Sequence, residues 1–240
     1  MLSYDTLKHK DREFLAATGL TVGEFLQLLT AFEAADQRLH PGDHTREGRP
    51  RQRGAGAGAK GRLTGSPDRL LFILVYQKTN PLQTMHALQF GLSQPQANHW
   101  IHRLLPVVQQ ALADLSLTPE RQADQVARSL LAQEGTPALV IDGTERRRQR
   151  PQDAEAQRTH YSGKKKAHTD KNLLLINENT RKVVYLGPTE AGKKHDKKAA
   201  DETRIVYPAC ATLDQDTGFQ GYAPEGTLTQ QPKKSVKASR

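Results

Sequence analysis

The spacing of apolar residues changes near residue 135, and this change constrains the fold more than any other feature of the 240-residue chain. Before that point apolar side chains recur three and four residues apart, as in "TVGEFLQLLTAFEAADQRL", which is the period of helices with one buried face. After it, runs rich in Val, Ile and Leu alternate with turn residues, which is typical of strands. The chain is long enough for two small domains. We therefore predict an α+β or α/β protein in which an all-helical domain precedes a mixed sheet.

The helical unit over residues 66–115 contains two short helices joined by a turn. The segment "NPLQTMHALQFG" predicts a helix capped by Asn80 and ended by Gly91, and Ser93 is expected to cap the next helix. This arrangement is typical of a helix-turn-helix, whose second helix enters the DNA major groove with its N-terminal residues first. The residues there that can hydrogen-bond base edges are Gln94, Gln96, Asn98 and His99. An ordinary three-helix packing unit is the alternative.

Lysine and arginine outnumber aspartate and glutamate by 35 to 26, which gives a formal net charge of +9. A solvated basic surface would explain this total, but clustering favours a polyanionic partner. The clusters are Arg146, Arg147, Arg148 and Arg150, then Lys164, Lys165 and Lys166, then Lys193, Lys194, Lys197 and Lys198. The single cysteine, Cys210, excludes an internal disulfide and indicates a reducing compartment. No stretch approaches the ~18 apolar residues of a membrane span, so we expect a cytoplasmic, nucleoid-associated protein without a membrane partner.

Acidic residues end or follow the predicted strands, which include "TPALVIDG", "KNLLLINEN", "RKVVYLGP" and "ATLDQDTGFQGYAP". In chain order they are Asp142, Asp196 and the pair Asp214 and Asp216. Carboxylates gathered at strand ends suit Mg²⁺ or Mn²⁺. Two such ions ~3.5–4 Å apart can activate a water and stabilise the leaving oxygen of a phosphodiester. Each aspartate alone is explained more simply as a turn or cap residue, whereas the combination with basic flanks and a helix-turn-helix favours a metal site acting on DNA.

Four motifs now carry a family resemblance over residues 136–234. They are "IDGTERRRQRP", "YSGKKKAHTDKN", "LGPTEAGKKHDKKAADE", and "DTGFQGY" followed by "QPKK". In order and spacing they resemble bacterial insertion-sequence transposases of the DDE class related to Harbinger-type transposases. The preceding helical unit resembles the N-terminal helix-turn-helix of that family.

The resemblance implies an RNase H-like core in which three carboxylates bind two Mg²⁺ ions, so that water and then a 3′-hydroxyl attack DNA phosphates. Asp142 and Asp216 match the first and second catalytic aspartates and would be metal ligands. Asp196 lies in a motif of the family and is the rival for the second metal-ligand role. The residues expected to contact DNA or support the site are Arg146, Arg147, Arg148, Lys164, Lys165, Lys166 and His168.

The chain departs from the family at its third carboxylate, a glutamate on a helix well downstream of "QPKK". The sequence ends at Arg240, and Glu225 in the turn "APEGT" is a poor substitute. We therefore expect an incomplete, C-terminally truncated transposase core. One hypothesis is a metal-dependent enzyme that cleaves and joins DNA at element ends; the other is an inactive product that acts only as an end-binding protein or repressor. An RNA-associated protein is disfavoured because aromatic residues make up only 5%.

Four regions are expected along the chain. They are an N-terminal helical segment (1–43), a basic Gly/Arg-rich linker (44–65), a helix-turn-helix domain (66–134) and an RNase H-like endonuclease domain (135–240). The expected partner is double-stranded DNA, both element ends and target. The sequence leaves open whether the protein forms a homodimer and whether a second reading frame supplies the missing glutamate.

Overall fold

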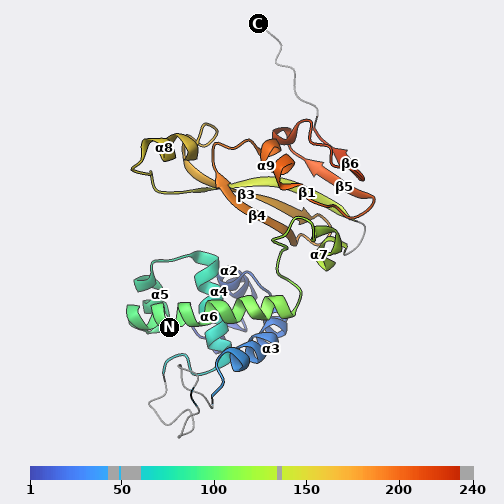
Figure 1. Ribbon diagram of the computed structural model, residues 1–240. Helices are drawn as coiled ribbons and strands as arrows, with labels where there is room; N and C mark the ends of the chain where they lie inside the picture. The colour runs from blue at the N-terminus through green and yellow to red at the C-terminus, as the bar shows by residue number, and fades with distance from the viewer. Residues whose placement is uncertain (43–48, 50–60, 134–136, 233–240) are drawn as a thin grey trace. The chain divides into compact units, whose positions relative to one another are not determined.

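The computed structural model describes residues 1–42, 49, 61–133 and 137–232, and the chain divides into two compact units, Met1–Leu117 and Thr118–Arg240 (Figure 1). Each unit has a hydrophobic core of its own. The expected boundaries differ from this division. The N-terminal helices share one core with residues 66–115, because Phe14, Phe25 and Phe32 pack with the apolar residues of that region. Most of the expected linker lies outside the described residues.

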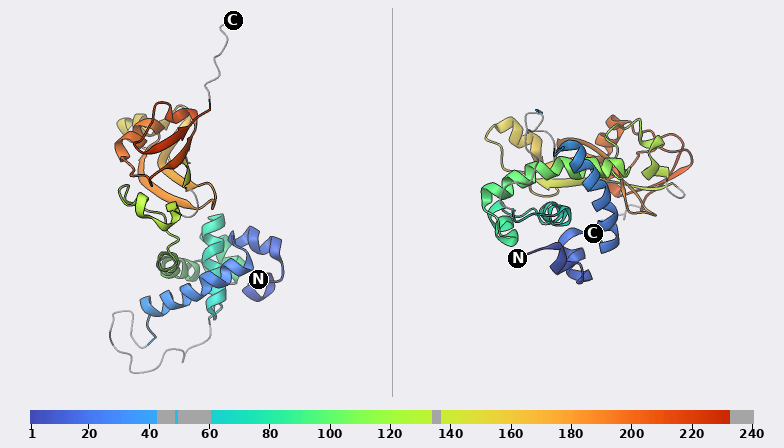
Figure 2. Two further views of the ribbon diagram at one scale, coloured as in Figure 1. Left: turned by 90° about the vertical axis from the view of Figure 1, so that its right-hand side faces the viewer. Right: turned by 90° about the horizontal axis from the view of Figure 1, so that it is seen from below.

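The first unit is helical and is organised around one apolar helix. Its helices are α1 (Tyr4–Leu7), α2 (Asp11–Thr18), α3 (Val22–Leu39), α4 (Ser66–Thr79), α5 (Gln83–Phe90) and α6 (Gln94–Asp114). Six consecutive residues of α4, from Leu70 to Val75, are buried, and a helix that is apolar all round belongs inside a bundle. Figure 2 shows α4 end-on, with the other helices around it. Among the described residues no single helix could cross a membrane; α2 and α3 pass that test only as a pair bent by 49°.

Of the two helix caps predicted from the sequence, Ser93 is confirmed and Asn80 is wrong. Thr21 and Ser93 each form a capping box, with the residue three positions later completing it. Asn80, however, does not begin α5. It ends α4 in the left-handed conformation with φ 42°, and α5 begins at Gln83. Asparagine can cap the start of a helix or take the left-handed conformation at the end of one. Here it takes the left-handed conformation at the end of α4.

The second unit is a curled mixed sheet (Figure 2). Its elements are η1 (Val126–Arg128), α7 (Leu130–Gln133), β1 (Ala138–Arg147), α8 (Ala154–His160), β2 (Tyr161–Ser162), β3 (Ala167–Asn177), β4 (Val183–Ala191), α9 (Asp196–Thr203), β5 (Ala211–Gln215), η2 (Thr217–Phe219) and β6 (Thr227–Gln230). The strand order is β2-β3-β1-β5-β6, and β4 also pairs with β3. β3 runs antiparallel to β1, β2 and β4, whereas β5 runs parallel to β1 and β6. The predicted mixed sheet is therefore confirmed, and β3 and β4 form a hairpin within it.

The first strand is longer than the sequence indicated, and this corrects the expectation that Asp142 ends it. Pairing of β1 with β3 continues to Arg147, opposite Thr169. Pairing with β5 stops earlier, at Ile141 opposite Gln215. Asp142 therefore lies inside β1, at the point where its neighbour on one side ends. Pairing with β3 stabilises the polar second half of the strand, which has no apolar pattern of its own.

Candidate functional site

The two aspartates expected to be catalytic each follow the last paired residue of two neighbouring strands. Asp142 and Asp216 directly follow the paired residues Ile141 and Gln215 of the parallel strands β1 and β5. Both side chains are exposed. Asp142 Oδ1 accepts a hydrogen bond from the Gly143 amide at 2.8 Å, and Asp216 Oδ1 accepts one from the Gly218 amide at 2.7 Å. No described residue donates to the second oxygen of either carboxylate, so each has an oxygen available for a ligand.

Asp196, the third expected ligand, lies beside Asp216, but its carboxyl group is paired with a lysine. It is the first residue of α9, which lies over the sheet. A Cβ built at Gly218 would be 2.8 Å from Asp216 Oδ1 and 2.9 Å from Asp196 Oδ2, so the two carboxyl groups are neighbours. Asp196 Oδ1 forms an ion pair with Lys171 Nζ at 2.7 Å. Gly143 leaves room for this carboxyl group, because a Cβ there would be 2.4 Å from Asp196 Oδ1.

Lys171 is the centre of a buried charge cluster beneath this edge of the sheet. Its side chain is 7% exposed, and its Nζ lies 3.5 Å from Glu145 Oε1 and donates to the Lys194 carbonyl at 2.8 Å. Thr169 Oγ1 donates to Glu145 Oε2 at 3.0 Å. Burial alone would raise the pKa of Glu145, but hydrogen bonds from Ser162 and Thr169 and the charge of Lys171 outweigh it and hold the pKa below its usual range. Glu145 therefore stays ionised and Lys171 keeps two anionic partners.

The donor set fits a hard divalent cation only in part. Exposed carboxylate oxygens on Asp142 and Asp216 are the donors that Mg²⁺ and Mn²⁺ prefer. Within the ranges that the structure describes, however, no three His, Cys, Asp or Glu side chains are arranged to hold a metal ion. Asp196 is near the pair but is held by Lys171.

The basic residues at the end of β1 and after it are not all free. Arg146 donates to Asn172 Oδ1 at 2.8 Å, and Arg148 donates to Asp170 Oδ1 at 2.9 Å. Arg147 is exposed, and no described residue bonds its side chain. The lysines Lys164, Lys165 and Lys166 are exposed in the turn between β2 and β3, where Lys166 has φ 49°. His168 lies on β3, with its ring edge-on to Tyr161 at 5.6 Å.

The helix-turn-helix residues also divide into bound and free groups. Gln83 of α5 accepts hydrogen bonds through its Oε1 from Gln94 Nε2 at 2.7 Å and from Asn98 Nδ2 at 3.2 Å. Gln96 Oε1 accepts from the Ser93 amide in the capping box. His99 is exposed and contacts only the Trp100 ring among the described aromatic pairs. Two of the four expected base-reading residues therefore join α5 to α6 in this structure.

Comparisons with known proteins match the helical region and the sheet region separately. Residues 61–114 match the family described as helix-turn-helix of DDE superfamily endonuclease, and residues 141–232 match the family described as DDE superfamily endonuclease. A probable transposase for insertion sequence element IS702 from Microchaete diplosiphon is 28% identical over 102 residues. The two matched regions are therefore similar to the two parts of DDE-superfamily insertion-sequence transposases. No solved structure matches it.

The match to the IS702 transposase covers 42% of this chain and 36% of that protein, so the alignment spans about a third of the relative. The DDE family match begins at Ile141 and includes both exposed aspartates. Lys171 and Glu145 were missed by sequence reasoning. The available signal was the alternation of side chains along a strand. Glu145 lies two residues after Gly143 and four residues after the buried Ile141, so its side chain is at an inward position of β1. A charge at such a position indicates a buried partner.

Proposed function

We propose that this chain acts on DNA as an insertion-sequence transposase, with the helix-turn-helix binding DNA and with Asp142 and Asp216 as metal ligands for phosphodiester cleavage and strand transfer. One observation carries the proposal. The β1–β5 register, with Ile141 opposite Gln215, makes the two exposed aspartates the next residues on adjacent parallel strands. Carboxylates so related can share one cation. The mixed sheet, with its first strand beside the strand that precedes Asp216, supports an RNase H-like core.

Members of this superfamily use divalent metal ions, and we propose Mg²⁺ or Mn²⁺, with two ions in a complete site. When bound, such ions lower the pKa of water and stabilise the leaving oxygen of the phosphodiester. Asp142 and Asp216 would hold a cation through the oxygens that accept no backbone hydrogen bond. Asp216 is the better second ligand than Asp196, because Lys171 neutralises Asp196.

The chain's own basic residues would hold the DNA. The side chains of Arg147 and of the exposed turn Lys164–Lys166 lack internal partners among the described residues and can neutralise backbone phosphates. In the helical unit, His99 and the amide nitrogen of Gln96 are the groups left to read base edges. A DNA partner is consistent with a cytoplasmic, nucleoid-associated location, and a homodimer is the assembly to test by light scattering.

The experiment compares Asp142→Asn and Asp216→Asn with Asp124→Asn, which makes the same change at an exposed site of the same unit. Mn²⁺ binding is measured by titration calorimetry, and nicking of labelled duplexes carrying element ends is measured with Mg²⁺ or Mn²⁺. We expect Mn²⁺ affinity to fall at least tenfold in the first two variants and to remain unchanged in the third. Equal Mn²⁺ affinity in all three would refute the metal site. DNA binding without nicking in the parent chain would leave only the end-binding function.

A further inference from the structure

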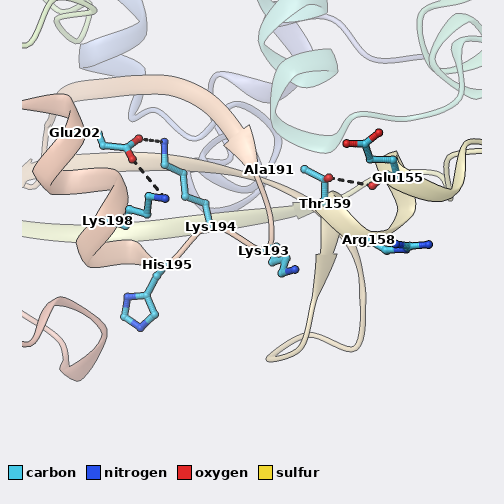
Figure 3. A pocket seen from close by; sticks show the side chains of 9 residues that line it. All are labelled: Glu155, Arg158, Thr159, Ala191, Lys193, Lys194, His195, Lys198 and Glu202. Carbon is cyan, nitrogen blue, oxygen red and sulfur yellow. Dashed lines mark hydrogen bonds and ion pairs between the residues drawn. The ribbon is translucent and has the colours of Figure 1, made fainter.

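An open hollow of about 600 Å³ lies between α8 and the loop that joins β4 to α9 (Figure 3). Its lining is mainly cationic, with Arg158 from α8 and Lys193, Lys194, His195 and Lys198 from the loop and α9. None of these residues takes part in the paired-strand site of Asp142 and Asp216. The hollow therefore needs an explanation of its own.

The cations of the hollow fall into two classes. Lys194 forms ion pairs with Glu190 at 2.9 Å and with Glu202 at 2.6 Å. Burial would lower the pKa of Lys194, but its hydrogen bonds to those two carboxylates outweigh burial and raise it. Arg158 and Lys193 are exposed, and no described residue forms an ion pair or hydrogen bond with either side chain. Two positive charges in one hollow thus lack an anion.

The lining acids do not neutralise these two cations. Glu202 is bound by Lys194 and lies 3.8 Å from Lys198. Figure 3 shows Lys194 directed toward Glu202, whereas Lys193 extends away from that pair. The lining holds four lysine or arginine side chains and two glutamates, so its net charge is positive.

The backbone holds the loop firmly in this position. The Lys193 amide donates to the Thr159 carbonyl of α8 at 3.3 Å, and the Gly192 amide donates to the Thr169 carbonyl of β3 at 3.0 Å. Gly192 has no room for a side chain, since a Cβ would lie 1.9 Å from Thr169 Oγ1 and 2.7 Å from the Thr169 carbonyl oxygen. A fixed loop presents its cation at little entropic cost on binding.

We propose that this hollow binds phosphate groups of the DNA backbone through Arg158 and Lys193, an inference that rests on the proposed action on DNA. Arginine and lysine are the side chains that hold backbone phosphates and fix the register of a protein on the duplex. The loop that carries Lys193 continues into Asp196, the neighbour of Asp216. The hollow therefore anchors the DNA that reaches the paired aspartates.

The test is the salt dependence of DNA binding, followed by fluorescence anisotropy on a labelled duplex. The double variant Arg158→Gln/Lys193→Gln is compared with Arg121→Gln/Arg128→Gln, which removes the same charge from exposed positions elsewhere in the same unit. Each lost phosphate contact lowers the slope of log K against log salt by about 0.9. We expect the slope of the first variant to fall by about 1 to 2 and its affinity to fall roughly tenfold at moderate salt, with a smaller change in the control.

The outcomes separate the two proposals. If the parent chain binds DNA and both double variants lose slope and affinity equally, the hollow is not a phosphate site, while the proposed function stands. If the parent binds no DNA even at low salt, both proposals fail. Titration with inorganic phosphate at constant ionic strength distinguishes a site for DNA phosphates from a site for free phosphate. Phosphate binding that depends on Arg158 and Lys193, together with DNA binding that does not, would assign the hollow to free phosphate and overturn the DNA contact.

Discussion

Replacing Lys171 by methionine should destabilise the sheet unit more than any surface change in it. Methionine keeps the length and most of the volume of the side chain but removes the charge that lies between Asp196 and Glu145. Both carboxylates are largely buried, with side-chain exposures of 16% and 6%. The substitution would leave two neighbouring anions without their shared cation. It would also leave the Lys194 carbonyl without the hydrogen bond it accepts from Lys171.

The magnitude follows from the geometry. At an effective dielectric constant of ~20, unit charges 2.7 Å apart attract by about 6 kcal/mol and charges 3.5 Å apart by about 5 kcal/mol. Desolvation of the buried ions offsets much of this attraction, and removing one partner of a buried pair costs about 3–5 kcal/mol. We expect the free energy of unfolding of the sheet unit to fall by about 4 kcal/mol at pH 7.

The deficit should depend on pH in a defined direction. Because the pKa of Glu145 is lowered in the folded protein, its contribution to stability is present above the ordinary carboxyl range and is lost as the pH falls through the folded pKa. Once the pH has fallen through the folded pKa of Glu145, that carboxylate is neutral and no longer needs Lys171. The difference between parent and Lys171→Met should therefore be full at pH 7 and should shrink in acid.

The assay is hydrogen exchange at increasing urea concentration, read on peptides from β1 and β3 and separately on peptides from α4. These peptides report the stability of each unit separately, whereas a single spectroscopic signal would combine the two units. Lys165→Met, in the exposed turn, is the matched control and should change stability by less than about 0.5 kcal/mol. Adding Glu145→Gln to Lys171→Met should recover part of the loss. A loss below about 1 kcal/mol at pH 7, or a loss that grows in acid, would refute the buried-cluster argument.

Two further predictions concern single side chains. Gly143→Ala should lower the free energy of unfolding by about 1–3 kcal/mol, because its Cβ would lie 2.4 Å from Asp196 Oδ1; wild-type stability in urea would contradict the close approach. His86 is fully buried against aromatic rings, and this burial lowers its pKa. The helical unit should therefore lose stability as the pH falls below about 6.5, by at most about 1.4 kcal/mol per pH unit. His86→Leu should remove that slope in thermal melts between pH 7.5 and 5.5, and an unchanged slope would exclude His86 as its source.

Sequence reasoning succeeded where short-range physics decides the structure. The capping boxes at Thr21 and Ser93 depend on contacts three residues apart, and the strand runs after residue 135 follow from a period of two. It failed at Asn80, where the same side chain suits the start of one helix and the end of another. It also ended β1 too early, because the polar half of that strand is stabilised by pairing with β3.

The sequence by itself determined a helical domain followed by a mixed sheet, the basic clusters, and the motifs that resemble DDE transposases. Only the tertiary structure decided how the acids relate. Strand pairing made Asp142 and Asp216 neighbours, and Lys171, at an inward position of β3, neutralised Asp196. It also separated the cations with partners, such as Lys194, from Lys193, which has none among the described residues. Composition counts charges, but whether a charge is satisfied depends on which distant segment folds against it.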